Sequence, residues 1–422
     1  MSRYHAYLKK AVAILALYKG QEPFSIFSKQ QFSLDRRMGA TDRRWVRHYC
    51  YCFFRMGKAL TDLPIEERIL LGIFLCGKKE DPLLALLRPE WNQLMTAPVG
   101  DKLPAINFAY PLDPARAIDR KEQRAAREVE GHTSVNSNLS LLAGWLQAVF
   151  PFQDFLSATL QQGHWPLSVW EQPLFFIRLR PDKEDLVCEA LKAQQIDYEK
   201  VGEYALGLAA TTSLDSWPGL HRDFVVQDLS SQRIAALLRH LPPNAVKSMW
   251  DCCAGSGGKS ILAIDTLGPV NLTVSDKRKS ILKQLKERFA QAGLTDYQVQ
   301  EIDLTKPIPS YFNDFFSLIW ADVPCSGSGT WSRTPEQLYF FESDTLAQYK
   351  ELQRSILQNA VGRLQPGGYL LYSTCSVFAM ENEQQVAWLE EEMGLSCIEQ
   401  QIFDGTTQRA DTLYAALLQK QR

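Results

Sequence analysis

The sequence predicts an α/β protein: a doubly wound, mostly parallel sheet in the second half of the chain, preceded by helices and a small α+β unit. From about residue 224, strand-like and helix-like segments alternate, a pattern typical of a parallel sheet covered by helices. Polar side chains follow several of these strands at turns rich in glycine or proline. Because ligands bind at the carboxyl ends of strands in open α/β sheets, we expect a binding site there.

The composition is that of a globular protein with more than one domain. The chain has 422 residues, of which 45% are hydrophobic and 22% charged. Its nine cysteines include no Cys-x-x-Cys pair, so we expect no disulfide framework, no metal site and a reducing, cytoplasmic location. The apolar run 11–17 is shorter than the roughly 20 residues that span a bilayer. We therefore expect a soluble protein, without a membrane partner, that acts as a monomer.

Residues 1–148 are expected to form an all-α domain with a linker. Apolar residues recur every three or four positions from Tyr4 to Tyr18 and again from Trp45, while 65–76 is apolar nearly all round and should be buried. Residues 1–130 hold 22 Lys and Arg against 15 Asp and Glu. This positive balance permits a nucleic-acid surface, although ordinary variation between domains explains it equally well.

Two further segments complete the first half of the chain. Residues 100–135, with several prolines followed by arginines among acids, are interpreted as a linker or an exposed helix, and 138–150 as an apolar helix. Residues 149–222 are expected to form a small α+β unit. Its predicted elements are a strand at 174–179, a helix at 182–194 and strands at 196–201 and 204–209.

Residues 223–422 are expected to form the doubly wound domain. The predicted strands are 246–252, 271–275, 297–302, 315–321, 369–373, 396–403 and 413–418. The predicted helices are 258–267, 277–292, 346–364 and 382–393. Each strand is short and each helix is long enough to cross the sheet, as βαβ units require.

A glycine-rich loop follows the first of these strands and suggests a nucleotide-like cofactor. Glycine at a strand-to-helix turn lets the backbone approach a ligand at the start of the helix. Asp276 lies 21 residues after Gly255, where an acid can bind the ribose hydroxyls of an adenosine-type cofactor. Asp303, after the third strand, is placed to face an adenine ring. The loop candidates for cofactor binding are Cys253, Ala254, Gly255, Ser256, Gly257, Gly258 and Lys259.

A P-loop is the main alternative for this segment. Gly258, Lys259 and Ser260 match the end of the phosphate-binding pattern, but Cys253 stands where its first glycine is needed for the tight turn. A P-loop would also leave Asp276 without a function.

Two cysteines at the ends of later strands suggest thiol chemistry. Cys325 follows Asp322 and Pro324 in an Asp-Val-Pro-Cys-Ser-Gly turn, and Cys375 comes 50 residues later in Ser-Thr-Cys-Ser. A thiol that adds to an electron-poor ring would give covalent catalysis. Chemistry alone does not decide which of the two is the nucleophile.

Residues 223–422 resemble the Fmu/Sun (RsmB-like) RNA cytosine-5 methyltransferases. The segment 251–260 resembles their Asp-x-Cys-Ala-Ala-Pro-Gly-Gly-Lys-Thr loop, 322–327 their Asp-x-Pro-Cys-Ser-Gly motif, 330–336 their substrate loop and 373–376 their Ser-Thr-Cys-Ser motif. The amino-terminal helices are similar to the NusB-like domain of that branch, and 149–222 to an RRM-like unit. The resemblance implies a Rossmann-like fold whose last strand is antiparallel.

The resemblance also assigns roles. It implies S-adenosyl-L-methionine as cofactor, bound by the glycine-rich loop with Asp276, Asp303 and Asp322. Carbon 5 of cytosine is a poor nucleophile, so a thiolate must add at carbon 6; the family pattern makes Cys375 that nucleophile and Cys325 the group that assists release, while Asp322 contacts the base. The candidates for contacting the substrate are Pro324, Trp331 and Arg333, with core packing as the alternative for Trp331.

Gly255 and Ser256 stand where the family usually has Ala-Pro, a departure that bears on cofactor affinity. The predicted function is methylation of RNA, most specifically ribosomal RNA of the small subunit. The alternatives are tRNA cytosine-5 methylation, a P-loop NTPase and a non-catalytic RNA-binding assembly factor.

Overall fold

The computed structural model describes residues 2–35, 37–110, 134–161, 165–214, 217 and 219–421. The chain divides into two compact units. The first comprises Met1–Asp154, His164–Gln172 and Trp331–Glu342, and the second Phe155–Gly163, Pro173–Thr330 and Ser343–Arg422. The arginine-rich part of the expected linker, 111–133, lies outside the described residues, and the expected domain limits at 148 and 222 stay predictions.

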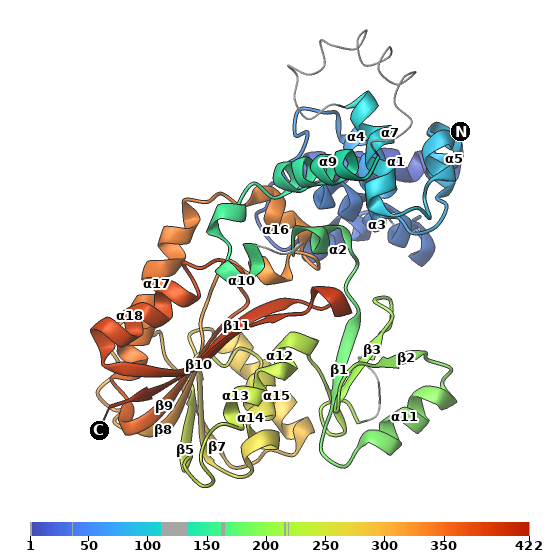
Figure 1. The fold of residues 1–422 in the computed structure, drawn as a ribbon. Helices are drawn as coiled ribbons and strands as arrows, with labels where there is room; N and C mark the ends of the chain where they lie inside the picture. Colours follow the sequence, from blue (N-terminus) through green and yellow to red (C-terminus); the bar gives the residue numbers. More distant parts are fainter. Residues whose placement is uncertain are drawn as a thin grey trace. The chain divides into compact units, whose positions relative to one another are not determined.

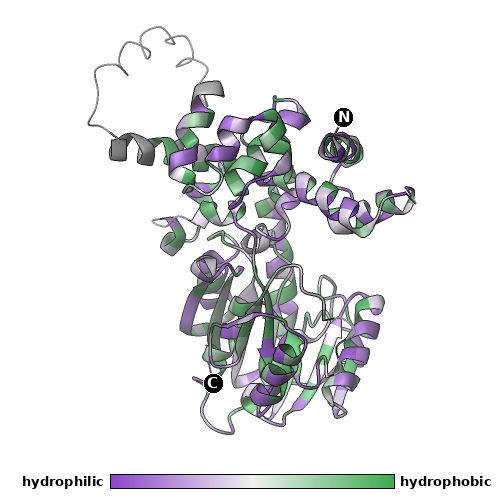
Figure 2. Cartoon of the chain, turned by 90° about the vertical axis from the view of Figure 1, so that its right-hand side faces the viewer, coloured by the Kyte–Doolittle hydropathy of each residue, from purple (hydrophilic) through white to green (hydrophobic). Residues whose placement is uncertain are grey.

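The first unit is helical throughout its described residues, as expected (Figure 1). Its helices are α1 (Arg3–Leu17), α2 (Phe24–Ser33), α3 (Ala40–Arg55), α4 (Ile65–Cys76), α5 (Pro82–Leu87), α6 (Pro89–Gln93), α7 (Val99–Ala109), α9 (Ser134–Val149) and α16 (Pro335–Phe340). Helix α4 is buried from Arg68 to Leu75, which agrees with its apolar pattern. Figure 2 shows hydrophobic and hydrophilic residues alternating on helices of this unit, the pattern of amphipathic packing.

Two residues show how these helices pack. A Cβ at Gly72 of α4 would lie 2.0 Å from the carbonyl oxygen of Cys52 in α3, so glycine is required where the two helices touch. Arg55, buried at the end of α3, donates hydrogen bonds to the carbonyl oxygens of Glu171 at 2.8 Å and Ser332 at 2.8 Å. Chain segments far apart in the sequence are thereby joined in one unit. No helix among the described residues is long and apolar enough to cross a membrane.

The second unit contains a seven-stranded sheet in its described residues, with the order β10-β11-β9-β8-β5-β6-β7. The strands are β5 (Ser248–Asp251), β6 (Asn271–Asp276), β7 (Tyr297–Glu301), β8 (Phe316–Asp322), β9 (Leu364–Thr374), β10 (Leu395–Asp404) and β11 (Thr412–Lys420). Strands β5 to β9 are parallel, and β11 is antiparallel to both neighbours. The expected doubly wound sheet with an antiparallel last strand is confirmed.

Helices cover both faces of this sheet, as Figure 1 shows. One hydrophobic core joins it to α13 (Ala235–Leu238), α14 (Gly258–Leu267) and α15 (Lys279–Ala292). The other joins it to α17 (Thr345–Val361) and α18 (Glu383–Met393). Strand β9 begins five residues before the predicted start at 369 because a register shift against β8 accommodates Pro366, Gly367 and Gly368.

A smaller sheet of the same unit has the order β2-β3-β1-β4 within the described residues. It is formed by β1 (Phe175–Leu179), β2 (Tyr198–Lys200), β3 (Ala205–Leu208) and β4 (Phe224–Val226), with α11 (Glu184–Ala193). The first three strands and the helix agree with the expected elements. Strand β4, which was not among the predicted strands and lies within the segment 223–422 assigned to the doubly wound domain, pairs with β1 of the small sheet.

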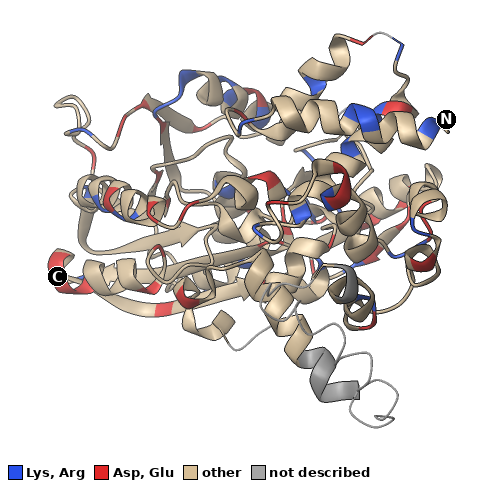
Figure 3. Ribbon diagram, turned by 90° about the horizontal axis from the view of Figure 1, so that it is seen from above, with Lys and Arg blue, Asp and Glu red and all other residues tan. Residues whose placement is uncertain are grey.

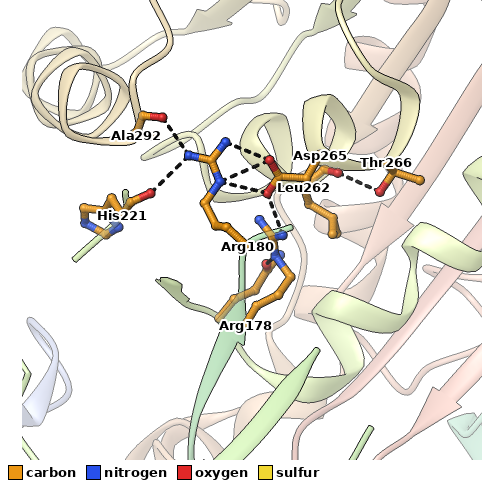
Figure 4. Close-up of polar contacts among 8 residues, drawn as sticks. Arg178, Arg180, His221, Leu262, Asp265, Thr266 and Ala292 are labelled. Carbon is orange, nitrogen blue, oxygen red and sulfur yellow. Dashed lines mark hydrogen bonds and ion pairs between the residues drawn. The ribbon is translucent and has the colours of Figure 1, made fainter. Parts of the chain in front are cut away.

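A buried ion pair holds the small sheet against the helices of the large one (Figure 4). Arg178 of β1 donates to Asp265 of α14 at 2.7 Å, and Arg180 donates to the other oxygen of that carboxylate at 2.7 Å. Arg180 also donates to the carbonyl oxygen of Ala292, the last residue of α15, at 2.6 Å. Asp265 therefore joins the small sheet to a helix that packs on the large sheet. Its removal would leave the buried Arg178 and the partly buried Arg180 without their carboxylate partner.

Candidate active site

The carboxyl ends of the parallel strands border a cavity of about 720 Å³. This volume falls in the roughly 300–1,000 Å³ range of small-molecule sites. Twelve of the fifteen predicted site residues line it: Cys253, Ala254, Gly255, Ser256, Gly258, Lys259, Asp276, Asp303, Asp322, Pro324, Cys325 and Cys375. The sheet thus brings together residues separated by up to 122 positions, as the strand order requires.

The glycine-rich loop turns sharply between β5 and α14. Gly255 and Gly257 have φ of +52° and +82°, backbone conformations that favour glycine. A Cβ at Gly257 would lie 2.4 Å from the ring of Phe289, whereas one at Gly255 would meet no described atom within 4 Å. Gly257 therefore permits close helix packing, while Gly255 leaves the loop backbone open to the cavity.

Ser256 receives a hydrogen bond from Arg288 of α15 at 2.9 Å, and Arg288 also donates to the carbonyl oxygen of Val226 in β4 at 3.2 Å. Where the family pattern has a rigid proline, this chain therefore holds its loop with an arginine. Arg288 also lines the cavity; it lies 32 residues from Ser256 on a helix, so no signal in the sequence pointed to this contact.

Asp276 ends β6 at the ribose side expected from the sequence. Its carboxylate accepts hydrogen bonds from the backbone nitrogen of Gly255 at 3.2 Å and from the backbone and side chain of Arg278 at 2.9 and 3.0 Å. Burial by itself raises the pKa of this carboxyl, but the hydrogen bonds from Arg278 and Gly255 outweigh burial and lower it. Asp276 is therefore ionised at neutral pH and fixed to the loop.

Asp303, two residues after β7, lies at the same side of the cavity. It accepts hydrogen bonds from the backbone nitrogen and hydroxyl of Thr305 at 3.1 and 2.7 Å. The hydroxyl bond is the main reason why the pKa of Asp303 is lowered.

Asp322, at the end of β8, connects the loop to the cysteines. One oxygen accepts a hydrogen bond from Lys259 at 2.6 Å, and the other accepts one from Ser373 at 2.8 Å. Burial lowers the pKa of the Lys259 ammonium, but attraction to Asp322 and the hydrogen bond to it, with a smaller contribution from Cys375, raise it overall. The fixed cation thus lies near one of the two thiols.

Lys259 and Ser260 do not form a P-loop arrangement. The hydroxyl of Ser260 is fully buried and donates to Asp251 at 2.5 Å, whereas a P-loop hydroxyl faces a phosphate-bound magnesium ion. Among the described residues, no group of three or more His, Cys, Asp or Glu is arranged to hold a metal ion.

The two cysteines meet at the cavity. Cys325 Sγ and Cys375 Sγ lie 3.2 Å apart at turns that follow the neighbouring strands β8 and β9. The hydrogen bond between the two thiols, then burial and the charges of Cys375 and Glu381, raise the pKa of Cys325 well above its ordinary value. Cys325 is therefore a neutral thiol at neutral pH, suited to proton transfer rather than to nucleophilic attack.

The remaining predicted residues lie elsewhere. Trp331 is fully buried in the helical unit, with its ring 4.9 Å from that of Phe341, and it is not among the residues lining the cavity. This burial fits the alternative interpretation, core packing. Arg333 is partly buried in the same unit and does not appear in the cavity lining.

Comparison with known proteins agrees with this architecture. The family described as 16S rRNA methyltransferase RsmB/F matches residues 238–416. A probable ribosomal RNA small subunit methyltransferase B from Synechocystis sp. is 31% identical over 371 residues, which cover 82% of this chain and 80% of that protein. The chain belongs to the RsmB/F family.

Other RsmB/F relatives match over shorter spans. The probable ribosomal RNA small subunit methyltransferase B of Bacillus subtilis is 30% identical over 52% of this chain and 49% of its own length. The chain thus spans about half the length of this curated relative. A crystal structure of PH0851 has the same fold, with a TM-score of 0.62 over 99% of this chain and 98% of that chain at 18% identity.

Proposed function

We propose that the protein is an S-adenosyl-L-methionine-dependent methyltransferase that forms 5-methylcytosine in RNA, specifically in ribosomal RNA of the small subunit. The observation that carries this proposal is the pair of thiols 3.2 Å apart in the cavity that also holds the glycine-rich loop and Asp276. Membership of the RsmB/F family supports the ribosomal substrate over tRNA.

The cavity suits the cofactor. The open backbone at Gly255 leaves room for a ligand against the loop, and the ionised Asp276 is fixed as an acceptor for the ribose hydroxyls. Asp303 is placed for the adenine side. When bound there, S-adenosyl-L-methionine supplies an electrophilic methyl group.

In this mechanism, Cys375 adds as a thiolate to carbon 6 of cytosine and makes carbon 5 nucleophilic. Asp322, held by Lys259 and Ser373, contacts the base at the ring nitrogen. After methylation, the proton at carbon 5 passes to solvent water, its bonding electrons restore the ring double bond, and the sulfur of Cys375 leaves as a thiolate. Cys325, neutral and 3.2 Å away, assists this release.

RNA binding is assigned in part to the amino-terminal helices, as a NusB-like domain, with the small sheet as an RRM-like unit. The sequences of α1 and α3 contain Lys and Arg residues that support this assignment, and Figure 3 shows Lys and Arg positions in blue on the ribbon near the N-terminus. Pro324 at the cavity is exposed and remains the nearest substrate candidate to the thiols, whereas Arg333 is retained as a contact outside the cavity. We place the protein in the cytoplasm, as a monomer.

Two measurements test the proposal. In calorimetry, S-adenosylhomocysteine should bind and ATP should not, because Ser260 is not available to a phosphate-bound ion. Bisulfite sequencing of RNA from cells with and without the protein should show one lost 5-methylcytosine in small-subunit rRNA. If the lost 5-methylcytosine lies in tRNA instead, the protein is a tRNA methyltransferase. If the protein binds S-adenosylhomocysteine but no 5-methylcytosine is lost, it is an assembly factor.

A further inference from the structure

A buried glutamate lies between the two cysteine turns. Glu381 is fully buried ahead of α18, and its side chain plays no part in the mechanism above. Burial of an ionisable side chain is costly unless hydrogen bonds satisfy it, so its partners indicate what it does.

Four hydrogen bonds converge on the carboxylate. One oxygen accepts from the backbone nitrogen of Ser326 at 2.8 Å and from the side-chain amide of Gln353 at 3.0 Å. The other accepts from the hydroxyls of Ser326 and Ser376, each at 2.5 Å. Both oxygens are therefore satisfied by donors from different parts of the chain.

These partners are the immediate neighbours of the thiols. Ser326 follows Cys325, and Ser376 follows Cys375. Gln353, from α17, also donates to the carbonyl oxygen of Pro324 at 3.1 Å. One carboxylate thus connects the residues that flank the first cysteine with the residue after the second.

The position of Glu381 is itself fixed. Its backbone carbonyl accepts a hydrogen bond from the hydroxyl of Tyr372 in β9 at 2.5 Å. The next residue, Asn382, accepts from the hydroxyl of Thr374 at 2.7 Å and donates to the carbonyl oxygen of Ser376 at 3.0 Å. The carboxylate is therefore anchored to the sheet strand that carries Cys375.

We propose that Glu381 is the positioning residue that sets the separation of Cys325 and Cys375 by binding Ser326 and Ser376 together. This inference rests on the proposed function, in which both thiols act on one base. The carboxylate also lies beside Cys325, because it binds the backbone nitrogen and the hydroxyl of the next residue, Ser326. Glu381 thus acts through its neighbours and does not touch the base.

The chemistry of the site requires a carboxylate rather than an amide. An ionised carboxylate accepts hydrogen bonds at both oxygens, whereas the glutamine amide has one accepting oxygen and one donating nitrogen. In Glu381→Gln, the amide nitrogen would face two N–H donors in one orientation; in the other, the hydroxyls of Ser326 and Ser376 would have to reverse their hydrogen bonds and accept from it. The substitution preserves shape and disrupts the link between the turns.

The kinetic test compares Glu381→Gln with Glu391→Gln, an exposed glutamate on α18. Glu381→Gln should lower kcat for RNA methylation on the order of 100-fold, the cost of displacing reacting groups by about 1 Å. KM for RNA and the affinity for S-adenosylhomocysteine should stay within twofold of wild type. Glu391→Gln should match wild type in all three.

A second readout measures the thiol separation without any RNA. Phenylarsine oxide is bound tightly by two thiols that lie close together, and Cys325→Ser defines the share of binding that comes from this pair. Glu381→Gln should lose the phenylarsine oxide binding that comes from the Cys325–Cys375 pair. Glu381→Asp, which keeps the charge, should retain part of this binding. Because this assay needs no methylation, it stays informative even if the proposed function is wrong.

Unchanged arsenical binding in a folded Glu381→Gln protein, or unchanged kcat, would overturn the positioning role. If Glu381→Gln does not fold, Ser376→Ala removes the hydrogen bond to Glu381, along with the contacts of that hydroxyl to Ser326, Ser328 and Phe378, and decides the question by the same two measurements. Loss of arsenical binding in Ser376→Ala would support the role, and wild-type binding would overturn it.

Discussion

The turns after β8 and β9 carry the same residue pair, Cys-Ser, but differ in the charges around the sulfur. Both serines bind the carboxylate of Glu381, and both sulfurs reach the same cavity. Glu381 contributes to the raised pKa of Cys325, whereas Cys375 lies close enough to Lys259 to contribute to the raised pKa of that ammonium.

Under the proposed function, this difference suits two similar turns to different roles. A nearby cation favours a thiolate, and a nearby anion favours a neutral thiol. Under the proposed function, these neighbouring charges support the order of nucleophile and release group that chemistry alone left open. These charges come from α14 and from the segment before α18, outside either cysteine motif.

Removal of the Lys259 cation should abolish the difference in charge between the two cysteine turns, and of the changes to charged residues at the cavity it should lower activity the most. Lys259→Met leaves Asp322 without its ion-pair partner and removes a positive charge close to Cys375, so kcat should fall about 100-fold, as for the loss of one electrostatic group at a reacting centre. Methyl transfer from labelled cofactor at saturating RNA measures this. Lys286→Met, on the exposed face of α15, is the control, and equal rates in both variants would refute the role of Lys259.

Asp276→Ala should weaken cofactor binding at one end of the cavity and leave the cysteine pair at the other end unaffected. A hydrogen bond to a charged group contributes roughly 1.5–3 kcal/mol, so the dissociation constant for S-adenosylhomocysteine should rise more than about tenfold. Binding of phenylarsine oxide to the cysteine pair should not change. Calorimetry provides the first value, with exposed Asp314→Ala as control; wild-type affinity in Asp276→Ala would show that this acid only holds Arg278.

Two buried carboxylates near the site, Glu381 and Asp251, differ in their hydrogen bonds, and this difference should appear in how stability depends on pH. Glu381 has donors at both oxygens, whereas no donor among the described residues reaches Asp251 Oδ1. Burial raises the pKa of Asp251 from 3.8 to about 7. The folded state therefore binds the Asp251 proton more tightly than the unfolded state does. The contribution of this proton to the free energy of unfolding is fully present below about pH 4 and is lost as pH rises through about 7.

Asp251→Asn carries no titrating proton and should lack this loss. The difference in unfolding free energy between wild type and Asp251→Asn should change by on the order of 4 kcal/mol from pH 4 to pH 8, since one pKa unit corresponds to about 1.36 kcal/mol. Urea unfolding at several pH values measures it. Parallel pH profiles of the two proteins would show that Asp251 does not titrate in this range.

The sequence predicted the large sheet and its polar edge because strand and helix periods alternate clearly, and acids or thiols follow each parallel strand. It did not predict that β9 begins at Leu364, since the bulge that admits Pro366 depends on pairing with β8. Nor did it predict the pairing of β4 with β1, because three residues carry too little pattern to specify a partner.

The same limit applies to the site. Ser373 was within a recognised motif, but Glu381 lies 55 residues from Ser326 and resembles an ordinary acid before a helix. Its role depends on four donors that converge only in the folded chain. For Trp331, the sequence suggested a functional role that the structure does not support. Its motif suggested a substrate contact, but the ring is buried against Phe150 and Phe341.

The most direct test of the thiol assignment is covalent trapping of RNA by two matched variants. Cys375→Ala should neither methylate RNA nor form an adduct, because no thiolate remains to add to carbon 6. Cys325→Ala should add and methylate but fail to release, so a protein–RNA adduct should persist through denaturing electrophoresis. An adduct that accumulates in Cys375→Ala and is absent from Cys325→Ala would contradict the account and make Cys325 the nucleophile.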